Sequence, residues 1–157
     1  MTTQSTAAPV RTSIVVDATR ERAFDVFTRG IDTWWPASHH LLDGELAEMV
    51  FEPRVGGDII DRTVDGRECR WATVLAYEPP HRVAFSWNIS LEWKLEPDPE
   101  KRSEVEVTFA EQSPGRTLVT LEHRHLERHG PGWESMRDAV ASPEGWDAGL
   151  GGFAAAL

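Results

Sequence analysis

The sequence predicts an α+β domain in which helices cover one face of an antiparallel sheet. Runs of strand length recur between turn-forming Gly and Pro residues from residue 46 to residue 126. Helical spacing of apolar residues, in contrast, is confined to segments near the two ends of the chain. The 157 residues, 40% of them hydrophobic, suffice for one domain with its own core. We expect this domain over residues 9–157, preceded by a disordered tail over residues 1–8.

The first element is expected to be a strand over residues 10–16, which are rich in β-branched side chains. Asp17 and Thr19 then offer caps for a helix, and apolar residues follow at helical spacing up to residue 31. Gly30 ends or bends this helix, and Pro36 stops one further turn. Two short helices are therefore predicted after the first strand.

The middle of the chain predicts six strands. Asp65-Gly66 is a strong hairpin turn signal. In several runs apolar and polar residues alternate, as Val105, Val107 and Phe109 do with their neighbours, which predicts one apolar and one hydrated sheet face. The expected strands cover residues 47–52, 58–63, 68–77, 82–87, 103–111 and 116–126.

The last part of the chain returns to helical periodicity. Residues 131–141 can form a short helix, and Ser142 followed by Pro143 is a good start for another. One apolar stripe of this last helix comprises Trp146, Leu150, Phe153 and Leu157. Such a stripe predicts a terminal helix laid across the sheet, enclosing a space that is either a filled core or a ligand cavity.

Three glycines lie within the turns of this terminal helix, at positions 149, 151 and 152. Each should cost roughly 1 kcal/mol relative to Ala in a helix interior. Packing onto the sheet must therefore hold the helix, and its glycines predict either a looser or a closer approach to the space beneath it.

Charge and composition exclude several classes of function. The chain has 16 Lys and Arg against 26 Asp and Glu, a net charge of −10, so a nucleic-acid backbone would be repelled. No apolar run approaches the roughly 20 residues of a membrane-spanning helix, and the first residues lack the features of a secretory signal. We expect a soluble cytoplasmic protein with neither a nucleic-acid partner nor a membrane partner.

Metal and cofactor chemistry have little support in the sequence. Cys69 is the single cysteine, which excludes an internal disulfide, and we expect it to be a reduced, half-buried thiol. His123 and His125 share a face of a predicted strand and His129 follows, so a three-imidazole metal site is one interpretation. The preferred interpretation is a partly buried, hydrogen-bonded His123. We predict no metal, no cofactor and no assigned catalytic residue.

Four stretches of the chain resemble a known family. They are TRERAFDVF leading to WWP (19–36), FEPRVGG (51–57), YEPPHRVAFSW (77–87) and GRTLVTLEH followed by GW (115–146). In this order and spacing they resemble the SRPBCC superfamily, in the branch similar to the C-terminal domain of the activator of heat-shock protein 90 ATPase. The resemblance implies the START-like helix-grip fold, in which a curved antiparallel sheet of six to seven strands wraps around a long C-terminal helix. The superfamily includes lipid carriers, hormone receptors, cyclases and co-chaperones, so the resemblance leaves the activity open.

The seven Trp residues are the compositional clue to a site, because a large indole is usually either buried or used in binding. Most are expected to face the space between sheet and terminal helix, as plain core or as the wall of a cavity. Trp93 and Trp133 lie near predicted loops, where they would shape an entrance. The residues expected to line a cavity are Trp34, Trp35, Phe51, Trp71, Phe85, Trp87, Val119, Leu121, His123, Trp146, Leu150 and Phe153.

Three functions follow as hypotheses. The first is a binding protein for a small apolar or aromatic ligand. The second is a cyclase or hydrolase that uses the same cavity, with His123 as acid or base. The third is a chaperone-cofactor-like interaction protein, which predicts a large exposed apolar patch. Leu118, on the predicted hydrated face, would be consistent with a homodimer.

Overall fold

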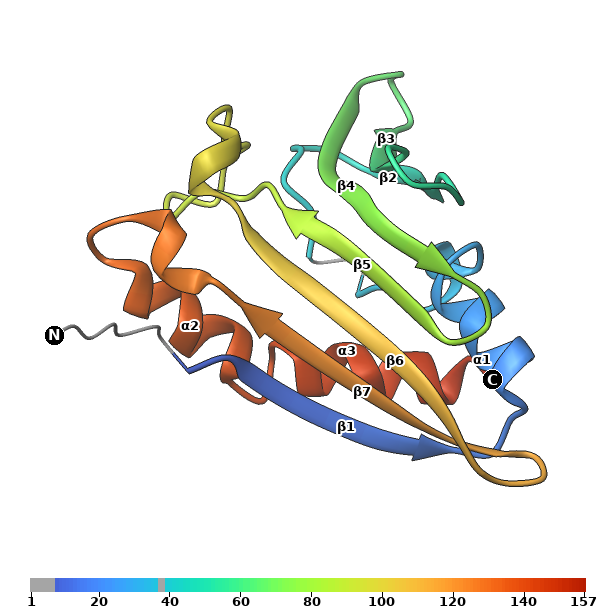
Figure 1. Ribbon diagram of the computed structural model, residues 1–157. Helices are drawn as coiled ribbons and strands as arrows, with labels where there is room; N and C mark the ends of the chain where they lie inside the picture. The colour runs from blue at the N-terminus through green and yellow to red at the C-terminus, as the bar shows by residue number, and fades with distance from the viewer. Residues whose placement is uncertain (1–7, 37–38) are drawn as a thin grey trace, which may run out of the picture.

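The computed structural model describes residues 8–36 and 39–157, so the predicted tail lies almost entirely outside the described residues. Its main feature is a seven-stranded sheet in the order β1-β7-β6-β5-β4-β3-β2, with every neighbouring pair antiparallel. The strands are β1 (Val10–Val16), β2 (Leu46–Phe51), β3 (Asp58–Thr63), β4 (Glu68–Glu78), β5 (Arg82–Trp87), β6 (Ser103–Ser113) and β7 (Arg116–Arg124). Figure 1 shows that the sheet curves and that α3 runs along one of its faces.

Most of the helical segments lie near the two ends of the chain, and one short segment lies in the connection between β5 and β6. The helical segments are α1 (Arg20–Phe27), η1 (Ile31–Thr33), η2 (Pro99–Lys101), η3 (Leu126–His129), α2 (Trp133–Ala141) and α3 (Trp146–Ala155). Thr19 caps α1, since its hydroxyl accepts a hydrogen bond of 3.2 Å from the N–H of Arg22. None of the described helices combines the length and the apolar composition needed to cross a bilayer. The predicted α+β helix-grip fold, including two short helices after the first strand, is confirmed.

The C-terminal helical segment is interrupted between α2 and α3. Ser142 does not begin a helix as predicted; residues 142–145 form a turn in which the N–H of Gly145 donates to the carbonyl of Ser142 at 2.9 Å. A Cβ built at Gly145 would lie only 2.2 Å from the carbonyl oxygen of Val140. Only glycine therefore permits this approach, and the close turn brings the end of α2 beside the start of α3.

The two faces of the sheet follow the predicted alternation over most of their area. Val105, Val107 and Phe109 of β6 are buried beneath the helices, whereas Glu104 and Glu106 are only partly buried on the outer face. Strand β5 differs, because its outward residues are buried as well. Ala84 and Ser86 are small and pair in register with Glu106 and Glu104, whose longer side chains flank them.

The space between the sheet and α3 is solid at the end nearest α1. Phe27 contacts Phe109 and Phe153 edge to face, with ring centroids 5.8 and 5.3 Å apart, and Phe24 also packs on Phe109. These rings are buried and form a true core. Figure 1 shows α2 near the opposite end of the sheet from α1, and residues of α2 line the open space described next.

Candidate functional site

A cavity of about 420 Å³ lies between the sheet and the C-terminal helices. Its walls come from β3, β4 and β5, from the loops after η1 and β5, and from the facing ends of α2 and α3. The size and the mainly apolar lining are typical of small-molecule sites. Its tryptophans are Trp35, Trp71, Trp87, Trp93 and Trp146.

Four of these indoles form a closed ring of contacts. Trp71 of β4 packs on Trp35 and on Trp87 of β5, with centroids 5.0 and 5.7 Å apart. Trp146, at the start of α3, completes the ring, 5.5 Å from Trp87 and 5.7 Å from Trp35. Each indole is therefore held by two others, and the cavity has a wall of preorganised aromatic surface.

Asp61 places a carboxyl group in this aromatic wall. The side chain, on β3, is only 1% exposed, and its Oδ1 accepts a hydrogen bond of 3.1 Å from Nε1 of Trp71. Its other oxygen, Oδ2, has no hydrogen-bond partner among the described residues. Burial raises the pKa of Asp61 to about 6. A carboxyl with a free oxygen and a pKa near neutrality is a group that a ligand can use.

Two further polar groups in the cavity lining have unused hydrogen-bonding capacity. Nε1 of Trp87, a residue only 5% exposed, and Nδ1 of His40 both lack partners within residues 8–36 and 39–157. An indole N–H can only donate, whereas a neutral imidazole nitrogen donates or accepts. Buried polar groups are usually paired, so a cavity that contains several unpaired ones has capacity for a polar ligand.

Cys69 lies beside Asp61 in the sheet, where β3 and β4 pair. The thiol is free, is more deeply buried than predicted at 2% exposure, and has a pKa that burial raises to about 11. A protonated thiol in this position is unreactive, so it contributes packing rather than chemistry.

His123 lies behind the aromatic wall in a buried hydrogen-bond chain. Nε1–H of Trp146 donates to its Nδ1 at 3.1 Å, so the ring proton must be on Nε2, which donates to Oγ of Ser103 at 2.7 Å. The hydroxyl of Ser103 then donates to Nε2 of His129 at 2.8 Å. Burial lowers the pKa of His123 to about 3, which keeps the ring neutral. Both nitrogens are used, so His123 acts on the cavity by positioning Trp146.

The residues predicted from the sequence fall into two groups. Four of them, Trp35, Trp71, Trp87 and Trp146, line the cavity together. The others are not among its lining residues and pack in the core around it. This second group consists of Trp34, Phe51, Phe85, Val119, Leu121, His123, Leu150 and Phe153.

Sequence reasoning missed the polar part of the site. Asp61 follows the fully buried Ile59 and Ile60 on β3, but the strand, DIIDRT, also contains Asp58 and Arg62, so the sequence holds no distinct signal for a buried carboxylate at position 61. The place of His40 in the lining follows from tertiary packing alone.

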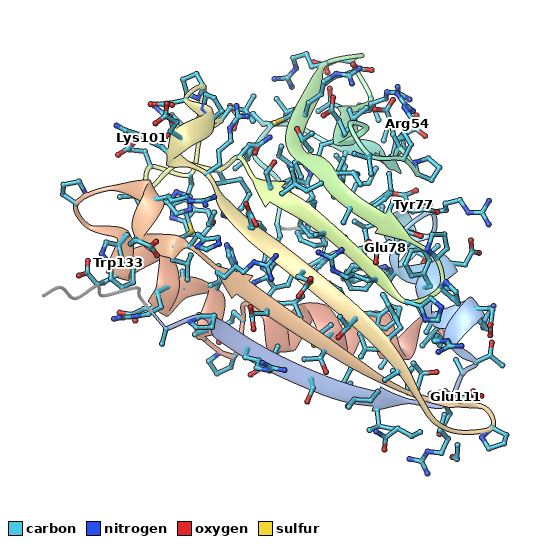
Figure 2. The ribbon with its side chains drawn as sticks, viewed as in Figure 1. Arg54, Tyr77, Glu78, Lys101, Glu111 and Trp133 are labelled. Carbon is cyan, nitrogen blue, oxygen red and sulfur yellow. The ribbon has the colours of Figure 1, made fainter. Side chains whose placement is uncertain are left out.

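Of the two residues predicted to shape an entrance, only one lines the cavity. Trp93 lines the cavity and is 47% exposed, at its rim. Trp133 lies outside the lining, at the periphery of the molecule (Figure 2), where Arg137 covers its ring at 5.2 Å.

The histidines considered for a metal site do not converge. His123 and His129 are bridged by the hydroxyl of Ser103. His125 takes a left-handed conformation with φ of 62°, which ends the strand direction after Arg124. Within the part of the chain that the structure describes, no group of three or more His, Cys, Asp or Glu side chains is placed to hold a metal ion.

Comparison with known proteins gives both a family and structural neighbours. Residues 17–157 match the family described as activator of Hsp90 ATPase homolog 1-like protein. Among solved structures, the anthrahydroquino-gamma-pyrone synthase Txn09 is 40% identical over 97% of this chain and 98% of its own, with a TM-score of 0.68. The self-sacrificing resistance protein CalC from Micromonospora echinospora is 24% identical, covering 94% of this chain and 92% of its own, with a TM-score of 0.61, and shares the fold. No curated protein matches the chain significantly.

Proposed function

Since the chain belongs to the family of activator of Hsp90 ATPase homolog 1-like proteins, within the SRPBCC superfamily that its motifs resemble, we propose that its cavity binds a small, flat aromatic ligand. The observation that carries the proposal is the ring of four indoles along one wall of the cavity. Indoles stack well on planar rings, and this wall is held in place before a ligand arrives, so little ordering cost remains at binding.

Catalysis on such a ligand is the second candidate. The structure 40% identical to this chain is that of a synthase, and Asp61 offers a carboxyl group inside the cavity with a pKa raised to about 6. A group of this pKa can exchange a proton near neutral pH. The sequence hypothesis gave this task to His123, but that ring is neutral, engaged at both nitrogens and outside the lining. In an enzyme, Asp61 is therefore the better candidate for acid or base.

A chaperone-cofactor role has less support. That hypothesis predicts a large exposed apolar patch. Among the described residues, the exposed large apolar side chains are spread over β1, β4 and several loops and turns. They are Val15, Val55, Val64, Leu75, Trp93 and Leu95.

The binding proposal is tested by isothermal titration calorimetry with 9,10-anthraquinone as the probe. Trp35 and Trp133 are both half-buried, but only Trp35 lines the cavity, so Trp35→Leu and Trp133→Leu form a matched pair. We expect the unsubstituted protein to bind the probe, Trp35→Leu to weaken binding about tenfold through lost stacking, and Trp133→Leu to leave it unchanged.

Absence of binding to the unsubstituted protein, or an equal loss in both variants, would contradict the proposal. Mass spectrometry of flat aromatic compounds before and after incubation with the protein separates the two functions. A converted product that disappears in Asp61→Asn supports the enzyme, whereas unchanged compounds that still bind support the binding protein.

A further inference from the structure

We propose that Asp61 and Trp87 act as a hydrogen-bond acceptor and donor that select, among flat aromatic ligands, those carrying a hydroxyl group and a carbonyl oxygen. This inference rests on the proposed binding function and names the ligand class. It starts from two buried polar atoms, Oδ2 of Asp61 and Nε1 of Trp87, that belong to residues of the cavity lining and have no hydrogen-bond partner among the described residues.

The carboxyl group of Asp61 is held so that one oxygen remains for a ligand. Its Oδ1 is engaged by the indole N–H of Trp71, which limits rotation of the group, while Oδ2 is left free. A ligand hydroxyl would satisfy Oδ2. A purely apolar ligand would instead leave this 1%-exposed carboxyl with an unpaired oxygen. Leaving a buried polar group unpaired costs free energy, and this cost makes the site prefer ligands with a hydroxyl group over ligands without one.

Trp87 supplies the opposite requirement. Its indole N–H can only donate, and the ring is fixed by edge-on contacts with Trp71 and Trp146, so the donor direction is set before binding. A carbonyl oxygen on the ligand can accept the hydrogen bond from this N–H. Both groups adjoin the same indole, because Trp71 donates to Asp61 and packs against Trp87. One planar molecule against the wall of the cavity can therefore meet both.

The charge state of Asp61 decides how strongly it accepts. Its pKa is raised to about 6 by burial and is drawn downward by the facing His40, while Cys69 in the paired strand is a neutral thiol. The other titratable groups of the lining are His39 and Glu144. Above pH 6 the carboxylate is the ionised acceptor, and hydrogen bonds to a charged group are the stronger kind. Because His40 lies near Asp61, a change of probe affinity with pH is attributed to Asp61 only if it is absent in Asp61→Asn.

The test compares three probes that share one ring system: 9,10-anthraquinone, 2-hydroxyanthraquinone and 2-methoxyanthraquinone. All three carry carbonyl oxygens, and only the second carries a hydroxyl donor. Calorimetry at pH 7.5 should show the unsubstituted protein binding 2-hydroxyanthraquinone at least about tenfold more tightly than the other two. In Asp61→Leu this preference should vanish. In Trp87→Phe all three probes should weaken together, because the carbonyl partner is lost.

Glu48→Gln is the matched control, since it removes an exposed carboxylate from the neighbouring strand β2 and should leave the preference intact. Equal affinity of the unsubstituted protein for all three probes would overturn the inference while leaving the binding function standing. The same holds if Asp61→Leu retains the preference. Absence of binding by any probe would overturn both. Should Asp61→Leu not fold, Asp61→Asn replaces it, because an Asn oxygen can still accept from Trp71, and a weakened preference is expected.

Discussion

Asp61 and His123 are two buried titratable residues whose surroundings give them different roles. Desolvation acts on both, raising the pKa of Asp61 to about 6 and lowering that of His123 to about 3. His123 has both ring nitrogens in hydrogen bonds, to Trp146 and Ser103, whereas Asp61 has one oxygen without a partner in the described chain. The fully paired group supports the wall of the cavity, and the half-paired group belongs to a residue of the cavity lining.

The lowered pKa of His123 predicts a specific loss of stability in acid. The unfolded state protonates near pH 6.5, while the folded state resists protonation down to about pH 3. Stability from this residue is therefore complete above pH 6.5 and falls as the pH decreases, by about 3 kcal/mol between pH 6.5 and 4. The raised pKa of Asp61 has the opposite sign, since it favours the folded state as the pH falls from about 6 toward 4.

Urea unfolding at a series of pH values checks this prediction with His123→Gln. Gln can accept from Trp146 and donate to Ser103 but does not titrate. We expect the variant to lose less stability than the unsubstituted protein between pH 6.5 and 4, whatever its stability at pH 7. If the free energy of unfolding fell equally with pH in both proteins, His123 would not be the cause of the loss of stability in acid.

The terminal helix is the element in which sequence and packing conflict most visibly. Its glycines predicted a looser or a closer approach, and the structure shows the closer one. A Cβ at Gly152 would lie 2.9 Å from the carbonyl oxygen of Trp34, whereas a Cβ at Gly151 would meet nothing within 4 Å. Gly152 thus lets α3 pack against the backbone that follows η1, and Gly151 has no such role.

Substituting these two neighbours with alanine should have opposite effects. Gly151→Ala gains helix propensity and should raise the free energy of unfolding by up to about 1 kcal/mol. Gly152→Ala gains the same propensity but must push α3 away from Trp34, so we expect a net loss of about 1 to 3 kcal/mol. Urea denaturation of both variants measures the difference, and equal stabilisation by the two would show that α3 does not pack closely at Gly152.

Over the whole molecule, the outer face of the sheet is organised by charge. Arg124 of β7 lies within 3.6 Å of Glu104 and 3.1 Å of Glu106 on β6, and 3.5 Å from Glu122 on its own strand. Arg82 joins the same network through Glu106. In a chain of net charge −10, these arginines neutralise carboxylates that would otherwise repel one another across the strands.

Arg124→Met should destabilise the protein by about 1 kcal/mol at low salt, because the carboxylates around Arg124 then repel one another. The loss should be smaller in 1 M NaCl, which screens this repulsion. Arg11 is the control, since its one ion pair among the described residues is with Glu122 and its side chain is 67% exposed. Arg11→Met should change stability little at either salt concentration. A loss in Arg124→Met that is independent of salt would indicate lost packing of the side chain instead.

The same outer face contains Leu118, which suggested a homodimer. It is half-buried and pairs in register with Val15 of the edge strand β1, itself 42% exposed. Homodimer formation through this area stays a prediction.

The sequence by itself determined the fold class, the strands and the clustering of most tryptophans. These depend on local signals: the two-residue period of strands such as β6, the turn at Asp65-Gly66 and the cap at Thr19. Such signals say which side of an element is buried, so they predict Trp71 and Trp146 on the faces that the sheet and α3 turn toward each other, and both residues line the cavity there. They do not say whether a buried residue meets another side chain or an open space.

Tertiary structure decided that second question. Phe153 and Trp146 share a face of α3, yet one is packed in the core against Phe27 and the other borders the cavity. The turn before α3, the loop after η1 and the position of Asp61 in the sheet come together from distant parts of the chain, and their meeting leaves the space unfilled. A cavity is a property of how elements fit together, which no periodicity within one element encodes.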